Sequence, residues 1–162
     1  MIITTKRVSW KENKFICEFH ADKDFSKISP ITQVQALCRS KDGKYVIYKD
    51  REGNYGLPGG SPEAGESLEE ALKRELLEEV AAVLLKAKPL LYLKFTHLPK
   101  SKGIITYQVR YLALVDPQEQ EIQDPDGVSI ERLLVNETEM TKLLNWGDSL
   151  QIYLDEAKKI NL

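Results

Sequence analysis

The chain has 162 residues, of which 42% are hydrophobic and 30% are charged, and its formal net charge is -2. This length fits a single domain over residues 1–162, and the hydrophobic content is too high for a disordered chain. The near-neutral total excludes a nucleic-acid binder that works by bulk positive charge, because neutralising phosphates needs an excess of Lys and Arg.

The first part of the chain predicts two pairs of strands before any long helix. Residues 2–9 and 13–20 favour a β-hairpin, which would form an N-terminal extension over residues 1–30. Residues 32–38 and 44–48 flank an Asp-Gly step, which is a strong turn signal between two strands. A long irregular loop rich in Gly and Pro is expected to follow them.

The second part begins with a helix over about residues 67–85, where Leu, Ala, Glu, Lys and Arg occur without Gly or Pro. Ser67 and Glu70 have the spacing of a capping box at its start. Strands are expected over 88–98, 103–115 and 128–135, followed by a short helix from Asn136 and an amphipathic helix over 150–160. These elements predict a mixed α/β domain built in layers.

The two cysteines, Cys17 and Cys38, are too few for a disulfide framework or a zinc site, and we expect both to be core residues. The longest apolar run, over residues 80–85, is far shorter than the ~20 residues that a membrane span needs. We therefore expect a reduced, cytoplasmic protein that neither inserts into membranes nor is secreted.

Negative charge is concentrated in one segment of the chain. Between Glu63 and Glu79, seven acids face only Lys73 and Arg74, which gives this segment a charge of -5. The remainder has 21 cations and 18 acids, a charge of +3. One acidic segment is therefore flanked by sequence that is mildly basic in total.

The predicted helix over 67–85 places two of these acids where apolar residues are expected. At 100° per residue, Glu79 lies about 40° from Glu75, within the stripe that contains Leu68 and Leu72, and Glu78 lies at its edge. Glu-rich helices usually present a solvated face, but solvated glutamates should avoid the apolar stripe. Like charges at this spacing repel each other, so a hard divalent cation is a suitable counter-charge.

The residues before and within this helix match a known pattern. Gly60 is followed by Glu66 after five intervening residues, by Arg74 after seven more, and then by ELLEE at 75–79. This resembles the Nudix box, G-x5-E-x7-R-E-U-x-E-E-x-G-U with U apolar, at every charged position. The pattern spans residues 60–82. The resemblance implies the Nudix fold, a mixed β-sheet sandwiched between helices (α/β/α).

The resemblance also implies the reaction and its residues. A Nudix pyrophosphohydrolase uses Mg²⁺ or Mn²⁺ to hydrolyse a nucleoside diphosphate linked to another group. It implies metal ligands at Glu75, Glu78, Glu79 and the carbonyl of Gly60, catalytic roles for Glu78 and Glu79, and support of the site by Gly59, Glu66 and Arg74. A nucleotide substrate is thus the expected small-molecule partner.

One position departs from the pattern, because Ala81 occupies the place of the late glycine. Glycine at a helix end often adopts a left-handed cap, a conformation that costs Ala roughly 1 kcal/mol. With Ala-Ala-Val-Leu-Leu following, we expect the helix to continue for another turn instead. All the carboxylates are intact, so Ala81 is not expected to abolish activity.

The resemblance to the Nudix family also implies a further catalytic carboxylate outside the box, in the loop after the strand 103–115. The candidates are Glu119, Glu121, Asp124, Asp126 and Glu131, although an acid in such a loop is more often simply solvated. We favour Asp126 because it directly precedes the strand 128–135.

The substrate is less well specified by the sequence. Side chains that could stack on a base are Tyr45, Tyr48, Tyr55, Phe95, Tyr107 and Trp146, and cations that could meet phosphates are Lys49, Arg51, Lys94, Lys100, Lys102 and Arg110. From these we select Arg51 and Tyr55 as substrate-binding candidates. The sequence does not favour a nucleoside triphosphate over an ADP-ribose-like substrate, and both remain candidates.

The alternative is a non-catalytic Nudix domain that senses a nucleotide or serves as a protein-binding scaffold. The intact glutamates favour the enzyme. Residues 1–30 would form either a homodimer contact or an edge hairpin.

Overall fold

The computed structural model describes residues 1–99 and 103–162. The elements are β1 (Ile2–Trp10), β2 (Asn13–His20), the 3-10 turn η1 (Phe25–Lys27), β3 (Ile31–Arg39), β4 (Tyr45–Asp50), β5 (Tyr55–Gly56), β6 (Gly59–Gly60), α1 (Leu68–Val80), β7 (Ala82–Leu98), β8 (Ile105–Pro117), β9 (Ser129–Val135), α2 (Glu137–Leu144) and α3 (Asp148–Ala157). The strands form one sheet in the order β1-β2-β7-β8-β3-β4-β5, with β6 paired to β3 and β9 to β4. Among the described residues, β3 with β8 is the one parallel pair.

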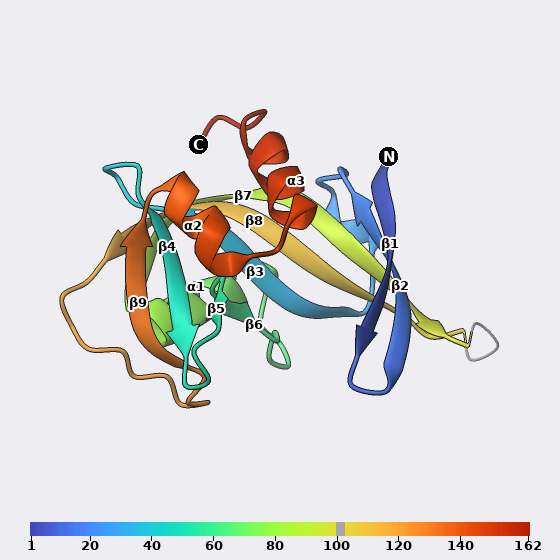
Figure 1. Ribbon diagram of the computed structural model, residues 1–162, viewed down its shortest axis with the longest axis horizontal. Helices are drawn as coiled ribbons and strands as arrows, with labels where there is room; N and C mark the ends of the chain where they lie inside the picture. Colours follow the sequence, from blue (N-terminus) through green and yellow to red (C-terminus); the bar gives the residue numbers. More distant parts are fainter. Residues whose placement is uncertain (100–102) are drawn as a thin grey trace.

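Helices cover both faces of this sheet, as Figure 1 shows. Alternate residues of β3 face opposite sides, as expected for a strand. Val34 and Ala36 pack with Leu72 and Leu76 of α1 in one core cluster. Leu37 belongs to a second cluster that includes residues of α2 and α3. The predicted α/β/α arrangement is therefore confirmed.

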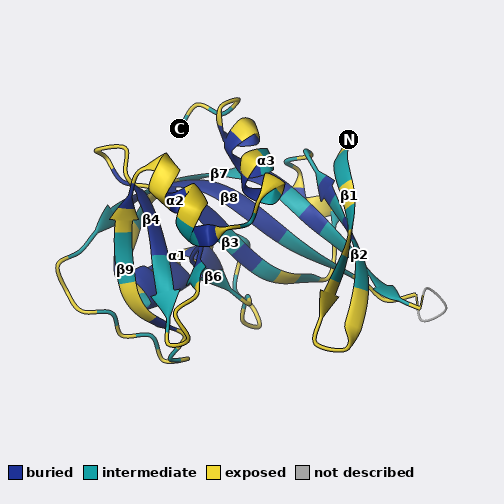
Figure 2. Ribbon diagram, in the orientation of Figure 1, coloured by how far each residue is buried: buried dark blue, intermediate teal, exposed yellow. Residues whose placement is uncertain are grey.

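The N-terminal hairpin has formed as predicted and extends the sheet at one end (Figure 1). Its second strand pairs antiparallel with β7, from Lys14 opposite Leu98 to His20 opposite Tyr92. Figure 2 shows that the hairpin is mostly half-buried or exposed, whereas β3 and β8 carry long buried stretches. Both cysteines are buried free thiols, one in each core cluster, in agreement with the sequence interpretation.

The main helix ends earlier than the sequence predicted. Its start is the expected capping box of Ser67 and Glu70, but α1 stops at Val80, and the expected extension to residue 85 is wrong. Ala81 caps the helix in the left-handed conformation, with φ 48° and ψ 45°. The chain turns there because Ala82 already pairs with Pro117 in the β7–β8 ladder, which supplies backbone hydrogen bonds that compete with the helix.

The remaining differences concern strand boundaries. The strand predicted over 88–98 begins at residue 82, and the loop predicted before the helix contains the two short strands β5 and β6. The short helix begins after Asn136 as predicted, and Asn136 and Glu139 form a capping box at its start. Within residues 1–99 and 103–162, no helix is both long and apolar enough to cross a membrane.

Candidate active site

Helix α1 buries two carboxylates, as the helical wheel predicted. Glu75 and Glu79 are each only 5% exposed, while Glu78 is half-buried at the edge of the apolar face. Between and beside them, Leu72 and Leu76 are fully buried in the core. The helix therefore points acidic groups into a region where most side chains are apolar.

The loop before the helix passes directly over these carboxylates. A Cβ atom at Gly60 would overlap the carboxylate of Glu75, and one at Gly59 would overlap the backbone of Val34 and Gln35 on β3. Only glycine permits this close approach. The amide of Gly59 also donates a hydrogen bond to Glu79 Oε1 at 3.3 Å. The Gly-Gly step thus joins the loop, β3 and α1.

One arginine meets several of these acids. Arg74 Nε and Nη2 donate to the two carboxylate oxygens of Glu66 at 2.8 and 3.0 Å, a bidentate pair. Its Nη1 lies 2.7 Å from Glu75 Oε1 and 3.4 Å from Glu78 Oε2. The hydrogen bonds from Arg74 hold the pKa of Glu66 at about 2. Arg74 therefore connects the loop to the helix and neutralises part of the acidic charge.

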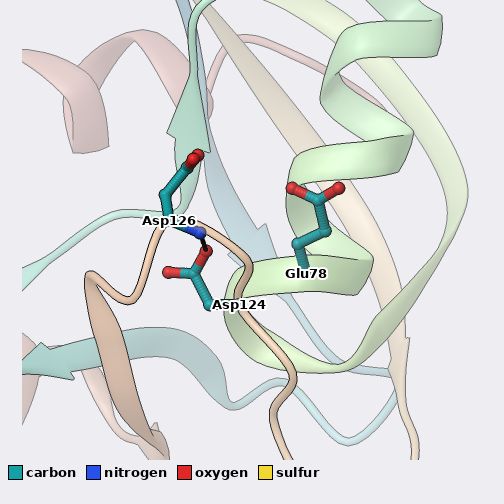
Figure 3. Close-up of side chains that lie close together, drawn as sticks. All are labelled: Glu78, Asp124 and Asp126. Atoms are coloured by element: carbon teal, nitrogen blue, oxygen red, sulfur yellow. Dashed lines mark hydrogen bonds between the residues drawn. The ribbon is translucent and has the colours of Figure 1, made fainter.

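A second group of acids comes from the loop before β9. One carboxylate oxygen from each of Glu78, Asp124 and Asp126 lies within 4.8 Å of the others (Figure 3). Asp124 accepts hydrogen bonds from the backbone amides of Asp126, Val128 and Ser129 at 2.9–3.0 Å, which fixes the loop. The structure therefore brings the favoured Asp126 to α1 and adds Asp124 beside it.

The acids and the loop enclose a cleft of about 480 Å³, whose lining includes Gly60, Arg74, Glu75, Glu79, Asp124 and Asp126. We call it the acidic cleft, and include Glu78 at its edge. Gln33 of β3 and Tyr48 of β4 complete its wall. Gln33 was missed in the sequence because nothing in the order of residues places a polar strand residue beside the Nudix-type helix.

The electrostatics of this cleft favour a bound cation. Burial raises the pKa of Glu79 well above its ordinary range, Glu75 and Asp124 add to the effect, and the Gly59 amide partly offsets it. Burial likewise raises the pKa of Glu78. Burial, reinforced by Glu79, raises the pKa of the Tyr48 hydroxyl to about 12. Carboxylate oxygens crowded in this way are the donors that hard divalent cations prefer.

Strand β9 anchors the end of α1 below the cleft. Ser129 Oγ donates to the carbonyl of Glu79 at 2.6 Å, and Arg132 Nη1 donates to the carbonyls of Val80, Ala81 and Gln118 at 2.8–3.2 Å. A cation at a helix C-terminus is favourable for its dipole. The sequence did not reveal the contacts with α1, because they join residues about 50 positions apart.

The two substrate-binding candidates lie outside the residues that line the acidic cleft. Arg51 is beside the loop before β9, where its guanidinium is next to Gly127. Tyr55 lines a separate hollow with Asn54 and Trp146, and the ammonium of Lys49 lies 5.8 Å from the centre of its ring. Two further cations considered above, Lys100 and Lys102, lie outside the described residues.

The fold agrees with comparisons against known proteins. The profile of the NUDIX domain matches residues 31–153. This chain belongs to the Nudix family. No significant match is found among curated protein sequences.

Solved Nudix structures resemble the chain over most of its length. A mutant of the Bacillus subtilis pyrophosphohydrolase BsRppH has a TM-score of 0.70 at 21% identity, covering 95% of this chain and 96% of that chain. The NUDIX domain of Shewanella oneidensis NrtR, crystallised with ADP ribose, has a TM-score of 0.60 at 23% identity, covering 86% and 94%. MutT from Methanosarcina mazei has a TM-score of 0.55 at 18% identity, covering 81% and 96%. These similarities establish the Nudix fold.

The family segment contains the whole acidic cleft. The Gly59–Gly60 loop, α1 and both aspartates fall within residues 31–153, whereas the β1–β2 hairpin precedes them. The hairpin therefore lies outside the segment that the family profile matches.

Proposed function

We propose that this Nudix protein is a metal-dependent pyrophosphohydrolase that cleaves a nucleoside diphosphate linked to another group. The observation that carries the proposal is the acidic cleft itself. Five carboxylates, from Glu75, Glu78, Glu79, Asp124 and Asp126, meet there, and Arg74 is a partial counter-charge. A diphosphate is also anionic, so it can approach these groups only with cations between them.

The donor set fits Mg²⁺ or Mn²⁺. Glu75, Glu78, Glu79 and the carbonyl of Gly60 would hold the ions, with Asp124 and Asp126 opposite. A bound divalent cation supplies charge neutralisation at the phosphates and lowers the pKa of water. Arg74 and Glu66 keep the loop and helix in place around it.

The chain's own residues would then direct the attacking water. Its oxygen forms a new bond to phosphorus, the bridging P–O bond breaks, and the leaving phosphate takes the electron pair. Glu79 would receive the water proton, because its carboxylate lines the cleft and the Gly59 amide fixes its orientation. Glu78 or Asp126 would serve as a second acceptor on the other side of the cleft.

The substrate class that we propose is a nucleoside triphosphate or an ADP-ribose-like nucleotide. The size of the cleft suits a diphosphate with its ions, and the similar NrtR domain was crystallised with ADP ribose. The cytoplasm, where both nucleotide classes occur, is the location that we propose for this activity.

Hydrolysis of a panel of nucleoside triphosphates, ADP-ribose and dinucleoside polyphosphates with Mg²⁺ or Mn²⁺, followed by chromatographic separation of the nucleotide products, tests the proposal. We expect turnover of at least one compound, abolished by chelation and lowered about 100-fold or more by Glu78→Gln. Glu69→Gln on the exposed side of α1 is the matched control and should keep full activity. Nucleotide binding without any hydrolysis would instead support a sensor.

A further inference from the structure

A second hollow lies on the face of the sheet opposite α1, between the β1–β2 hairpin and α3. Its volume is about 370 Å³, and Phe19, Gln35, Phe95, Arg110, Trp146 and Tyr153 are among the residues that line it. We call it the hairpin pocket. Lys6 of the hairpin donates a hydrogen bond to Ser149 of α3 at 3.0 Å and so joins the two walls, which are neighbours in Figure 1.

The pocket contains a buried cation without an anionic partner. Arg110 is only 5% exposed, and its hydrogen-bond acceptors are the hydroxyl of Tyr153, the side chain of Gln108 and the carbonyl of Val109, at 2.8–3.1 Å. All three acceptors are neutral. No carboxylate pairs with Arg110 in residues 1–99 or 103–162. Burying an unpaired charge is costly, so a ligand that completes its hydrogen bonding would be favoured.

The remaining walls suit a flat aromatic ligand. Phe19, Phe95, Trp146 and Tyr153 surround the space, and the rings of Trp146 and Tyr153 meet edge to face with centroids 6.1 Å apart. Aromatic side chains of this kind stack on nucleobases of any type. The pocket is mainly apolar, so the hydrogen bonds of Arg110 would distinguish one base from another.

Strand β3 connects this pocket to the acidic cleft. Gln33 lines the cleft and Gln35 lines the pocket, two positions apart on the same face of the strand, which corresponds to about 7 Å. Gln35 is also paired with Gly59, and its side-chain amide donates to the carbonyl of Leu57 at 3.1 Å. A nucleotide could thus place its phosphates in the cleft and its base in the pocket.

We propose that the hairpin pocket binds the base of the nucleotide substrate and that Arg110 selects a 6-oxopurine, such as guanine. Arginine donates two parallel hydrogen bonds to the adjacent O6 and N7 acceptors of guanine, whereas adenine presents a donor at one of these positions. The proposal rests on the proposed pyrophosphohydrolase function and narrows its substrate to guanine-type nucleotides.

The same inference gives the hairpin a role. Lys6, Val8, Cys17 and Phe19 all line the pocket and come from β1 and β2, outside the family segment 31–153. The hairpin therefore supplies one wall of the base site.

The test compares GTP with ATP in the full chain with Mg²⁺. We expect kcat/KM to favour GTP by about tenfold or more, chiefly through KM. Arg110→Gln should remove or reverse the preference for GTP, because Gln matches the hydrogen-bonding edge of adenine. Tyr153→Phe should reduce the preference, because Arg110 loses its hydrogen bond to the Tyr153 hydroxyl. Arg7→Gln, at an exposed position of the same hairpin, is the matched control and should keep the ratio.

Equilibrium binding of GMP and AMP, followed by tryptophan fluorescence, separates this inference from the proposed function. A preference for GMP that Arg110→Gln or Tyr153→Phe weakens supports the base site even if no nucleotide is hydrolysed. Hydrolysis with equal kcat/KM for GTP and ATP in the wild-type chain would overturn the base assignment and leave the pyrophosphohydrolase intact. A preference for ATP or ADP-ribose over GTP would also overturn the base assignment.

Discussion

The acidic cleft and the hairpin pocket lie beside neighbouring positions of β3, at Gln33 and at Gln35, and carry opposite imbalances of charge. In the cleft, five carboxylates share Arg74 as a partial counter-charge, whereas in the pocket the buried Arg110 has only neutral partners. Neither arrangement is favourable for folding alone, because buried charge needs compensation. We infer from this difference that a ligand carrying cations would compensate the charge in the cleft, and that hydrogen-bond acceptors of a ligand would suit Arg110 in the pocket.

The largest effect should come from removing charge in the cleft while the pocket stays intact. Asp126→Asn and Asp124→Asn should each lower kcat by about 100-fold, since both carboxylates face Glu78. Asp124→Asn should also lower the free energy of unfolding by about 1–2 kcal/mol, because three backbone amides lose a charged acceptor.

The steady-state rate of nucleotide hydrolysis measures the first effect, and urea denaturation measures the second. Glu121→Gln, an exposed change in the same loop, serves as the control and should alter neither. An unchanged kcat in both aspartate variants would show that the loop before β9 takes no part in catalysis.

A smaller effect should appear in the pH dependence of stability without divalent cations. The pKa of Glu79 is raised in the folded protein above the ordinary value of 4.5, so the folded state binds more protons than the unfolded state above that pH. The free energy of unfolding should therefore fall as the pH rises above 4.5, by up to about 1.4 kcal/mol per unit. Denaturation in EDTA at several pH values measures this slope.

Glu79→Gln should flatten that slope, because the uncharged amide does not titrate. Added Mg²⁺ should flatten it in the wild-type chain, because the ion compensates the ionised form. Identical slopes for the wild-type chain and Glu79→Gln would show that Glu79 ionises as freely as a surface carboxylate, contrary to the charge imbalance described above.

The smallest effect is expected at Ala81, which touches neither region directly. Glycine would relieve the left-handed conformation by about 1 kcal/mol, but it would also lose a fully buried methyl group worth about 0.8 kcal/mol. Ala81→Gly should therefore leave the free energy of unfolding nearly unchanged in thermal or urea denaturation. A gain of orders of magnitude in turnover would show that this residue limits catalysis.

The sequence predicted those parts of the molecule that depend on local spacing. The burial of Glu75 and Glu79 follows from helical periodicity, and both capping boxes follow from a three-residue interval. The layered fold follows from the order of strands and helices. The Nudix box itself is such a local pattern, so the family could be identified from 23 residues.

What the sequence could not predict depends on contacts between distant elements. The helix end at Val80 is decided by the pairing of Ala82 with Pro117 and by the hydrogen bonds of Arg132, and both of these partners lie far along the chain from the helix. Asp124 joins the cleft because it folds its own loop, a role that composition does not reveal. The residues of the hairpin pocket come from positions between 6 and 153, so no local sequence motif predicts the pocket.

Direct titration of Mn²⁺ into the nucleotide-free protein, followed by electron paramagnetic resonance, tests the central claim about the acidic cleft. We predict that the wild-type chain binds Mn²⁺, that Mg²⁺ competes for the site, and that Glu78→Gln weakens binding by about tenfold or more while Glu69→Gln does not. Equal Mn²⁺ binding in wild type and Glu78→Gln, or none in either, would contradict the claim that these carboxylates form the metal site.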